Sequence, residues 1–283
     1  MLTYEKLSRH PKTFSRLTGV SIGLFSEMAE KIRPLWESRR DNFDEGGRSY
    51  SISGLEDHLP AMLIYYRCYI TYVFMGFLFS SHETTVMRSV GRIERIAVKV
   101  IHIEKNRQIT AEEAEYLITD VTEQPVQRPV RRQKKYYSGK KKRHTHKIEI
   151  TADAGGKIHS VSGSHPGKVH DFNIYKSKKK RHRFPGVPEK ADSGYQGIHK
   201  IKKNAEIPYK KPKGGQLSPE QKKFNRELSE KRIKAENVIR DIKIFKVMSD
   251  TYRNRCKGHN IKINIIAGIV NMKTEKRLLK KAA

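Results

Sequence analysis

The segment EYLITDVTEQPVQRP (residues 115–129) predicts a buried strand with a carboxylate on it. Its apolar run leads into Asp120, and its prolines mark the end, because proline cannot donate the amide hydrogen bond of a strand ladder. Two further acids stand in short distinctive phrases, Asp192 in ADSGYQG and Glu236 in RIKAENVIRDIK. Carboxylates suit Mg²⁺ or Mn²⁺, and two such ions about 3.5–4 Å apart can activate water for phosphodiester cleavage. We therefore expect folding to bring these three acids together around two divalent ions.

The residues that follow Asp120 predict a mixed sheet. Residues 146–151 alternate between apolar and polar side chains, as a half-buried strand does. A glycine-containing turn at 153–156 leads into a third strand, and strand and helix patterns then alternate up to the second acid. The predicted elements are strands at 115–121, 146–151 and 157–163, a helix at 170–177, a strand at 188–192 and a short strand at 206–210. This order is typical of an α/β fold, the ribonuclease-H-like core, with a mixed five-stranded sheet flanked by helices.

A long helix follows, and it carries the third acid. Ser218 suits the N-cap, Pro219 the first helical position and Gln221 the third, which completes a capping box. The helix is predicted to extend to about Met248, with Glu236 at the edge of its apolar stripe. That stripe consists of Phe224, Leu228, Ala235, Val238, Ile239 and Ile242. In a ribonuclease-H-like core the three acids would lie on the first central strand, at the end of the fourth strand and on this helix.

Residues 1–105 predict a helical domain. Helices are expected at 14–36, 55–67, 72–79 and 83–98, with a loop at 39–53 and a tight turn at 80–81. Two helices joined by so short a turn match a helix-turn-helix, at about 55–98, whose second helix enters the major groove of DNA. Val86, Val90, Ile93 and Ala97 would then pack inward, and Thr85, Arg88 and Arg92 would face DNA. A plain helical subdomain is the alternative, because the turn lacks the usual glycine.

The charge of the chain points to a polyanionic partner. Lys and Arg number 59 against 30 Asp and Glu, a formal net charge of +29. Such an excess opposes compaction by self-repulsion, and phosphate neutralisation is the ordinary way to relieve it. A ribosomal or RNA-associated protein would show the same charge. Only Cys68 and Cys256 are present, and no apolar signal region or membrane span is evident, so we expect a cytoplasmic protein in a reducing compartment.

Two basic runs extend this interpretation. Residues 131–147 hold nine Lys or Arg in seventeen positions without an acid, and residues 176–183 hold six in eight. Such runs are usually solvated loops, or they can serve as nuclear-import signals. Contact with the DNA backbone is the better interpretation beside a cleavage site, and the interleaved tyrosines could stack on an unpaired base. The candidate DNA-binding residues here are Tyr136, Tyr137, Lys140, Lys141, Lys142 and Arg143.

Several long phrases resemble bacterial insertion-sequence transposases of the DDE class, in the group related to Harbinger-type transposases. TDVTEQPVQRP is similar to the family's D-x-T-E-x-P-I-x-R-P phrase, with Val121 where a small residue is commoner. QKKYYSGKKKRHTHK, HPGKVHDFNIY and ADSGYQG resemble three other family phrases in the same order. Around Glu236 the family signature is Y-x2-R-x3-E-x6-K; Arg232 and Lys243 match it, whereas Ser229 replaces the tyrosine. The resemblance covers nearly the whole chain.

The resemblance implies roles for these residues. Asp120 and Asp192 would hold the metal ions, Glu236 would complete the second metal site, and Arg232 and Lys243 would contact phosphates near the cleaved bond. Salt bridges on the helix surface are the alternative for that last pair. Asp171 could orient a ligand or approach a metal, or it could be a helix N-cap with a structural role only.

The resemblance also implies an activity and a domain order. The enzyme would bind the terminal inverted repeats of its element as a homo-oligomer, cut double-stranded DNA and transfer the strand to target DNA. Residues 1–105 would bind DNA, residues 111–250 would form the catalytic domain, and the basic segment 251–283 would be helical and packed on the core. Two alternatives stand beside this: a catalytically inactive, transposase-derived sequence-specific DNA-binding protein, and a basic RNA-associated protein.

Overall fold

The computed structural model describes residues 1–40, 52–104, 108–178, 184–254 and 258–282. Most of the predicted loop at 39–53, most of the basic run at 176–183 and Cys256 lie outside these residues. The described chain divides into two compact units. The first unit contains residues 1–102, 243–250 and 261–269, and the second contains residues 103–242, 251–260 and 270–283.

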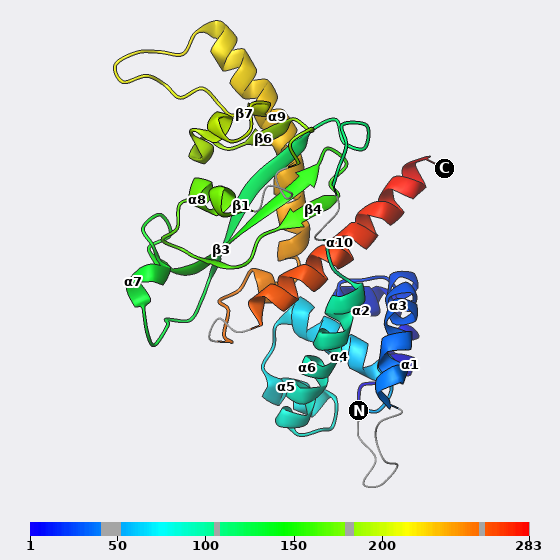
Figure 1. The fold of residues 1–283 in the computed structure, drawn as a ribbon. Coiled ribbons are helices and arrows are strands. Elements are labelled where there is room, and N and C mark those ends of the chain that lie inside the picture. The colour runs from blue at the N-terminus through cyan, green and yellow to red at the C-terminus, as the bar shows by residue number, and fades with distance from the viewer. Residues whose placement is uncertain (41–51, 105–107, 179–183, 255–257, 283) are drawn as a thin grey trace. The chain divides into compact units, whose positions relative to one another are not determined.

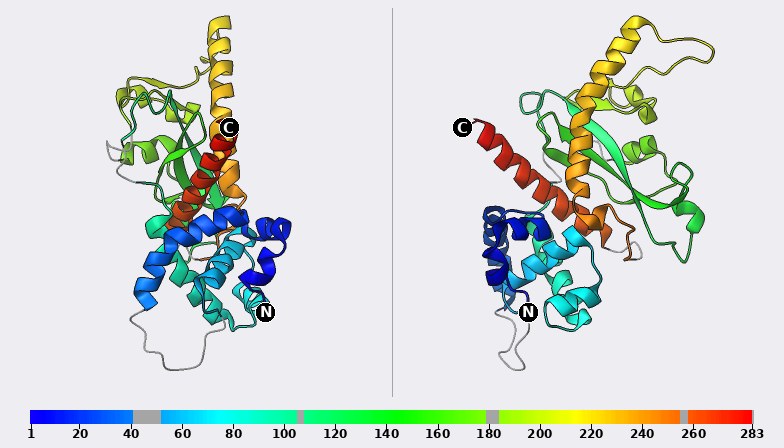
Figure 2. Two further views of the ribbon diagram at one scale, coloured as in Figure 1. Left: turned by 90° about the vertical axis from the view of Figure 1, so that its right-hand side faces the viewer. Right: turned by 180° about the vertical axis from the view of Figure 1, so that it is seen from behind.

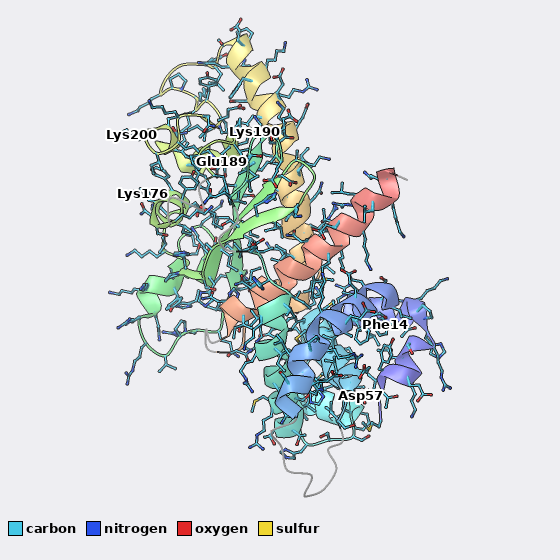
Figure 3. The ribbon with its side chains drawn as sticks, turned by 45° about the vertical axis from the view of Figure 1, so that its right-hand side comes forward. Phe14, Asp57, Lys176, Glu189, Lys190 and Lys200 are labelled. Atoms are coloured by element: carbon cyan, nitrogen blue, oxygen red, sulfur yellow. The ribbon has the colours of Figure 1, made fainter. Side chains whose placement is uncertain are left out.

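The first unit is helical. Its helices are α1 (Tyr4–Ser8), α2 (Pro11–Thr18), α3 (Ile22–Arg40), α4 (Leu55–Cys68), α5 (Tyr72–Leu78) and α6 (Glu83–Val100) (Figure 1). The prediction of one helix at 14–36 was wrong, because Gly19 ends α2 with a φ of 79°. A left-handed residue at this position stops a helix, and a Cβ on Gly19 would meet the Phe245 ring at 2.9 Å, so a side chain does not fit there. Phe14, labelled in Figure 3, packs edge-on against the Phe25 ring at 5.4 Å in the unit's core.

Two late segments of the chain complete the first unit. One is the 3₁₀ turn at Lys246–Met248, and the other is the part of α10 (His259–Ala282) at residues 261–269. Lys262 is 4% exposed, and its Nζ donates to the buried Glu94 of α6 at 2.8 Å. The hydroxyl of Tyr66 donates to the same carboxylate at 3.0 Å. A buried carboxylate is costly unless it is paired in this way, so the late segment is part of the unit's core.

Helices α5 and α6 lie where the helix-turn-helix hypothesis places its two helices, and a short turn joins them. The predicted inward residues of α6 are all buried: Val86, Val90, Ile93 and Ala97. The glycine that the turn lacks is inside α5 instead, because a Cβ on Gly76 would meet the Ser81 carbonyl oxygen at 2.6 Å. Gly76 therefore lets the turn pack closely on the helix. Ser80 takes the left-handed position of the turn, with a φ of 48°.

The outer face of α6 differs from the expectation. Of the three predicted DNA-facing residues, Arg88 is exposed, whereas Thr85 and Arg92 are half-buried. Burial lowers the pKa of His58, and the nearby charge of Arg92 lowers it further. Arg95 and Lys99 are exposed at seven and eleven positions after Arg88, so these three cations share one face of the helix.

The second unit contains a mixed sheet built around β1 (Leu117–Pro125). Its other strands are β2 (Tyr137–Ser138), β3 (Arg143–Asp153), β4 (Ile158–Val161), β5 (His165–Pro166), β6 (Glu189–Ala191) and β7 (Ala205–Glu206). The order β4-β3-β1-β6-β7 has β3 antiparallel to β1 and β4, and β6 parallel to β1 and β7. β2 and β5 are two-residue strands that also pair with β3. This strand order confirms the predicted ribonuclease-H-like core.

Helices α7 (Gln133–Tyr136), α8 (Asp171–Ser177) and α9 (Pro219–Lys243) accompany the sheet (Figures 1 and 2). The predicted capping box is present, because the Gln221 amide donates to Ser218 Oγ at 3.2 Å and the Ser218 amide donates to Gln221 Oε1 at 3.0 Å. α9 is shorter than predicted and ends at Lys243. The predicted strand at 206–210 was largely wrong, because β7 ends at Glu206.

Replacing Ser80 with glycine should stabilise the first unit. A left-handed backbone strains any residue with a Cβ, so we expect Ser80→Gly to raise the free energy of unfolding by about 0.5–1 kcal/mol. Ser81→Gly is the matched control, because the adjacent residue has no positive φ; it should be neutral or destabilising. Urea denaturation of the full chain measures both variants. A loss of stability in Ser80→Gly equal to that of Ser81→Gly would contradict the strain argument.

Candidate functional site

The register of two parallel strands places the first two acids side by side. β1 pairs with β6 from Leu117↔Glu189 to Thr119↔Ala191. The next residue on β1 is Asp120, and the next after β6 is Asp192. Since paired strands lie about 4.8 Å apart, both carboxylates start from neighbouring backbone positions at the same end of the pair.

Each of these carboxylates is held by the amide that follows it. The Val121 amide donates to Asp120 Oδ1 at 2.8 Å, and the Ser193 amide donates to Asp192 Oδ1, where Asp192 caps the 3₁₀ turn Ser193–Tyr195. One oxygen of each carboxylate is thus oriented by the backbone. The Val121 side chain packs against the buried apolar cluster that contains Tyr175 of α8. Asp120, one residue earlier on the strand, therefore points to the opposite face of the sheet.

Helix α9 brings the third acid and a cation close to Asp120. The pKa of Asp120 is raised, chiefly because the carboxyl is buried. The Val121 amide and the charge of Arg232 lower this pKa, and the carboxylates of Asp192 and Glu236 raise it. Arg232 and Glu236 are one helical turn apart on α9. Asp192 and Glu236 therefore both lie near enough to Asp120 to act on its carboxyl electrostatically.

The chemistry of these donors suits a hard divalent cation, but the three acids do not surround one point. Within the described residues, no group of three or more His, Cys, Asp or Glu is arranged to hold a metal ion. The mutual repulsion that raises the pKa of Asp120 is what a bound cation would relieve. The amides of Val121 and Ser193 hold only Oδ1 of Asp120 and Asp192, and the second oxygen of each carboxylate suits a hard divalent ion as a ligand.

Asp171 is not a helix N-cap. The N-cap of α8 is His170, which makes no side-chain capping bond, and Asp171 is the first residue of the helix. Its Oδ1 accepts a hydrogen bond from Lys147 Nζ at 2.9 Å, and the same ammonium donates to the Val169 carbonyl at 2.9 Å. A Cβ built on Gly194 would be 3.6 Å from Asp171 Oδ2, so this ion pair lies beside the turn that follows Asp192.

The other predicted site residues are placed as follows. Arg232 is half-buried, and within the described residues its Nε has no hydrogen-bond partner. Lys243 ends α9 and belongs to the first unit. Lys140, Lys141, Lys142 and Arg143 are all exposed. Tyr137 is 43% exposed, whereas Tyr136 is half-buried with its ring edge-on to His146 at 5.4 Å.

A buried network of charged residues, which no sequence pattern predicted, lies beside the site. Glu149 of β3 pairs with Lys178 at 2.5 Å, and the Tyr195 hydroxyl donates to the same carboxylate at 3.2 Å. Burial raises the pKa of Glu149, and Lys178 opposes that rise. Tyr195 is three residues after Asp192, so this network fixes the turn on which the second acid stands.

A second buried ion pair is linked to this network through Thr119, the residue before Asp120 on β1. Glu189 of β6, labelled in Figure 3, pairs with Lys202 at 2.8 Å and accepts a hydrogen bond from Tyr175 at 2.9 Å. Thr119 bonds both Glu189 and Thr151. Lys202 and Glu189 are 3% and 1% exposed. Because Thr119 precedes Asp120, the two pairs brace both strands that carry the aspartates.

A family of endonucleases matches the part of the chain that contains this site. Residues 119–272, more than half of the chain, match the DDE superfamily endonuclease family. The chain therefore belongs to the DDE superfamily endonucleases.

A relative described as a transposase is similar to this chain over most of its length. The chain is 36% identical over 265 residues to a protein of Microchaete diplosiphon described as a probable transposase for insertion sequence element IS702. The alignment covers 92% of this chain and 94% of that relative, and the two matches together confirm the resemblance to bacterial insertion-sequence transposases. No solved structure matches the chain. Among the described helices, none is both long and apolar enough to cross a membrane.

Removing one partner of a buried ion pair should unfold the second unit readily. Lys202→Met leaves the Glu189 carboxylate buried without its cation, so we expect a loss of about 3–5 kcal/mol in the free energy of unfolding. Lys203→Met removes the neighbouring lysine, which is exposed, and should change stability by less than about 0.5 kcal/mol. Chemical denaturation compares the two. Similar stabilities would show that the pair is not a determinant of the fold.

Proposed function

We propose that this protein is a DDE transposase that binds the ends of its element and cuts and joins DNA with divalent metal ions. The observation that carries the proposal is that Asp192 and Glu236 both lie near enough to Asp120 for their charges to act on its buried carboxyl. Membership of an endonuclease family supports a nuclease, and the carboxylates supply the chemistry that a metal-dependent nuclease needs.

The chain's own residues would prepare the site before DNA arrives. Asp120 and Asp192 would hold Mg²⁺ or Mn²⁺ through the oxygens that their following amides leave free, with Glu236 completing the second position. The ions would supply an activated water and stabilise the leaving oxygen. Arg232, close to Asp120, favours the ionised form of that carboxyl and so keeps it ready for a cation. The ion pair of Lys147 with Asp171 would hold the turn after Asp192.

The first unit would supply recognition of the element's ends. The exposed cations of α6, Arg88, Arg95 and Lys99, form one face of a helix that follows a tight turn. This geometry suits a recognition helix in a major groove, with base contacts from its first turns and phosphate contacts from its later ones. The exposed run Lys140–Arg143 would add backbone contacts in the second unit. Bringing two ends together implies at least a dimer.

A nicking assay tests the mechanism. Labelled duplex carrying the element's own end is incubated with Mg²⁺ or Mn²⁺ at low salt, with wild type, Asp120→Ala and Glu236→Ala. Because a lost metal ligand removes several kcal/mol of transition-state stabilisation, we expect cleavage to fall about 10³-fold or more in both variants. Glu227→Ala is the control, since this acid is exposed on the same helix away from the site; it should cleave as wild type does.

The outcomes separate the proposals. Cleavage by wild type that EDTA abolishes, with DNA binding retained by all variants, supports the metal–carboxylate mechanism. Cleavage by Asp120→Ala, or cleavage that survives EDTA, contradicts it. Binding of the end sequence by every protein, with no cleavage by any, would identify a transposase-derived DNA-binding protein.

A further inference from the structure

The segment that leads from β7 into α9 is an ordered arm rather than a loose loop. We call residues 207–226 the basic arm; in Figures 1 and 2 it extends away from the strands of its own unit. The Tyr209 amide donates to Asn225 Oδ1 at 2.8 Å, and Asn225 Nδ2 donates to the Tyr209 carbonyl at 3.0 Å. The Tyr209 ring lies 5.2 Å from the Phe224 ring. The Asn225 side chain thus fixes the arm's backbone to the first turns of α9.

The tip of the basic arm is a defined turn. The Gly215 amide donates to the Pro212 carbonyl at 3.2 Å, and Gly214 has a φ of 79°. Glycine at the third position of a turn is the usual way to reach that conformation. Three exposed lysines surround this turn: Lys210, Lys211 and Lys213.

The basic arm carries many positive charges, and its lysines form no ion pairs within the described residues. Residues 207–226 contain six Lys or Arg and a single acid, Glu220. Within the described residues none of the arm's five lysines forms an ion pair, and all five are exposed. Tyr209, directly before Lys210, is 51% exposed. Ordering like charges around an exposed aromatic ring opposes folding in a chain of this net charge, so a binding role explains the arm better than a structural one.

The chemistry of the arm selects its partner. Lysines contact phosphates as point charges, and an aromatic ring among them suits a sugar or a base. An acidic protein would also attract the lysines, but it would give the half-exposed tyrosine no sugar ring to contact. The arm also belongs to the endonuclease unit, on the helix that carries Glu236.

We propose that the basic arm binds the phosphate backbone of the DNA duplex a short distance from the cleaved bond. This inference rests on the proposed function for the position of that bond. Asn225 precedes Glu236 by eleven residues, which is about 16 Å along a helix at 1.5 Å per residue. For a duplex that runs along α9, with a rise of about 3.4 Å per nucleotide in each strand, the arm contacts phosphates roughly five base pairs from the bond that Glu236 serves.

Salt dependence of binding measures this contact directly. Affinity for a duplex is measured in the cleavage-deficient Asp120→Ala background over a range of salt concentrations, with and without replacement of Lys210, Lys211 and Lys213 by alanine. Each lost phosphate contact lowers the slope of log K against log salt by about 0.9, so we expect the slope to fall by about two to three. The control replaces Lys12, Lys280 and Lys281, which are exposed and lie elsewhere, and should change the slope by less than about one.

A second comparison locates the contact. The affinity gap between arm and control variants should appear on duplexes that extend at least about ten base pairs beyond the cleavage site on both sides, and disappear when the flanks are cut to about three. Asn225→Ala keeps every charge but releases the arm, so it should weaken binding about threefold while the slope stays near wild type.

The result that overturns the inference is equal loss of affinity and slope in the arm and control variants. Arm dependence that is unchanged on the shortest duplexes would overturn the assigned position. These readouts use binding alone. A wild type that binds but never cleaves would therefore count against the proposed catalysis while leaving the arm contact measurable.

Discussion

The parallel pairing of β1 with β6 is the constraint on which the site depends. Parallel strands cannot be joined by a hairpin, so the chain must leave the sheet and return before Asp192 can stand beside Asp120. A slip of one residue would turn Thr119 toward the face of Asp120 and bury a carboxylate in the apolar cluster beneath α8. The buried bonds from Thr119 to Glu189 and Thr151 oppose that slip, because they form in one register only.

Two buried ion pairs hold the strands of the site in place, and the fold is sensitive to the loss of either partner of a pair. Glu149 and Glu189 are removed from water in a protein with a net charge of +29, and each is paired with a lysine. Such pairs add little net stability over apolar residues, but breaking one is expensive. Their effect here is positional, since Tyr195 and Thr119 connect them to the neighbours of Asp192 and Asp120. The cations of this chain are therefore divided between an interior set that shapes the site and an exterior set that faces solvent.

Much of the second unit could be predicted from the sequence, because its signals are local. Alternation marked β3, the capping box marked the start of α9, and the acids stood in recognisable phrases. The ion pairs were not predictable, since Glu149, Lys178, Glu189 and Lys202 are charged residues that ordinarily face water, and nothing local shows that they meet. The break between α2 and α3 had a local signal in Gly19, which the helical periodicity on both sides outweighed. The glycine of the helix-turn-helix was sought in the turn, whereas close packing requires it at Gly76.

The completion of the first unit by residues 243–250 and 261–269 has a consequence for synthesis. Glu94 acquires its partner Lys262 only after the ribosome has translated the second unit's strands and α9, which precede this lysine in the sequence. Until then the early helices hold a buried carboxylate without its cation, an arrangement that folds poorly. A truncated product that kept the helix-turn-helix but lacked the later segments would therefore be unstable. Such fragments would therefore not accumulate as folded protein.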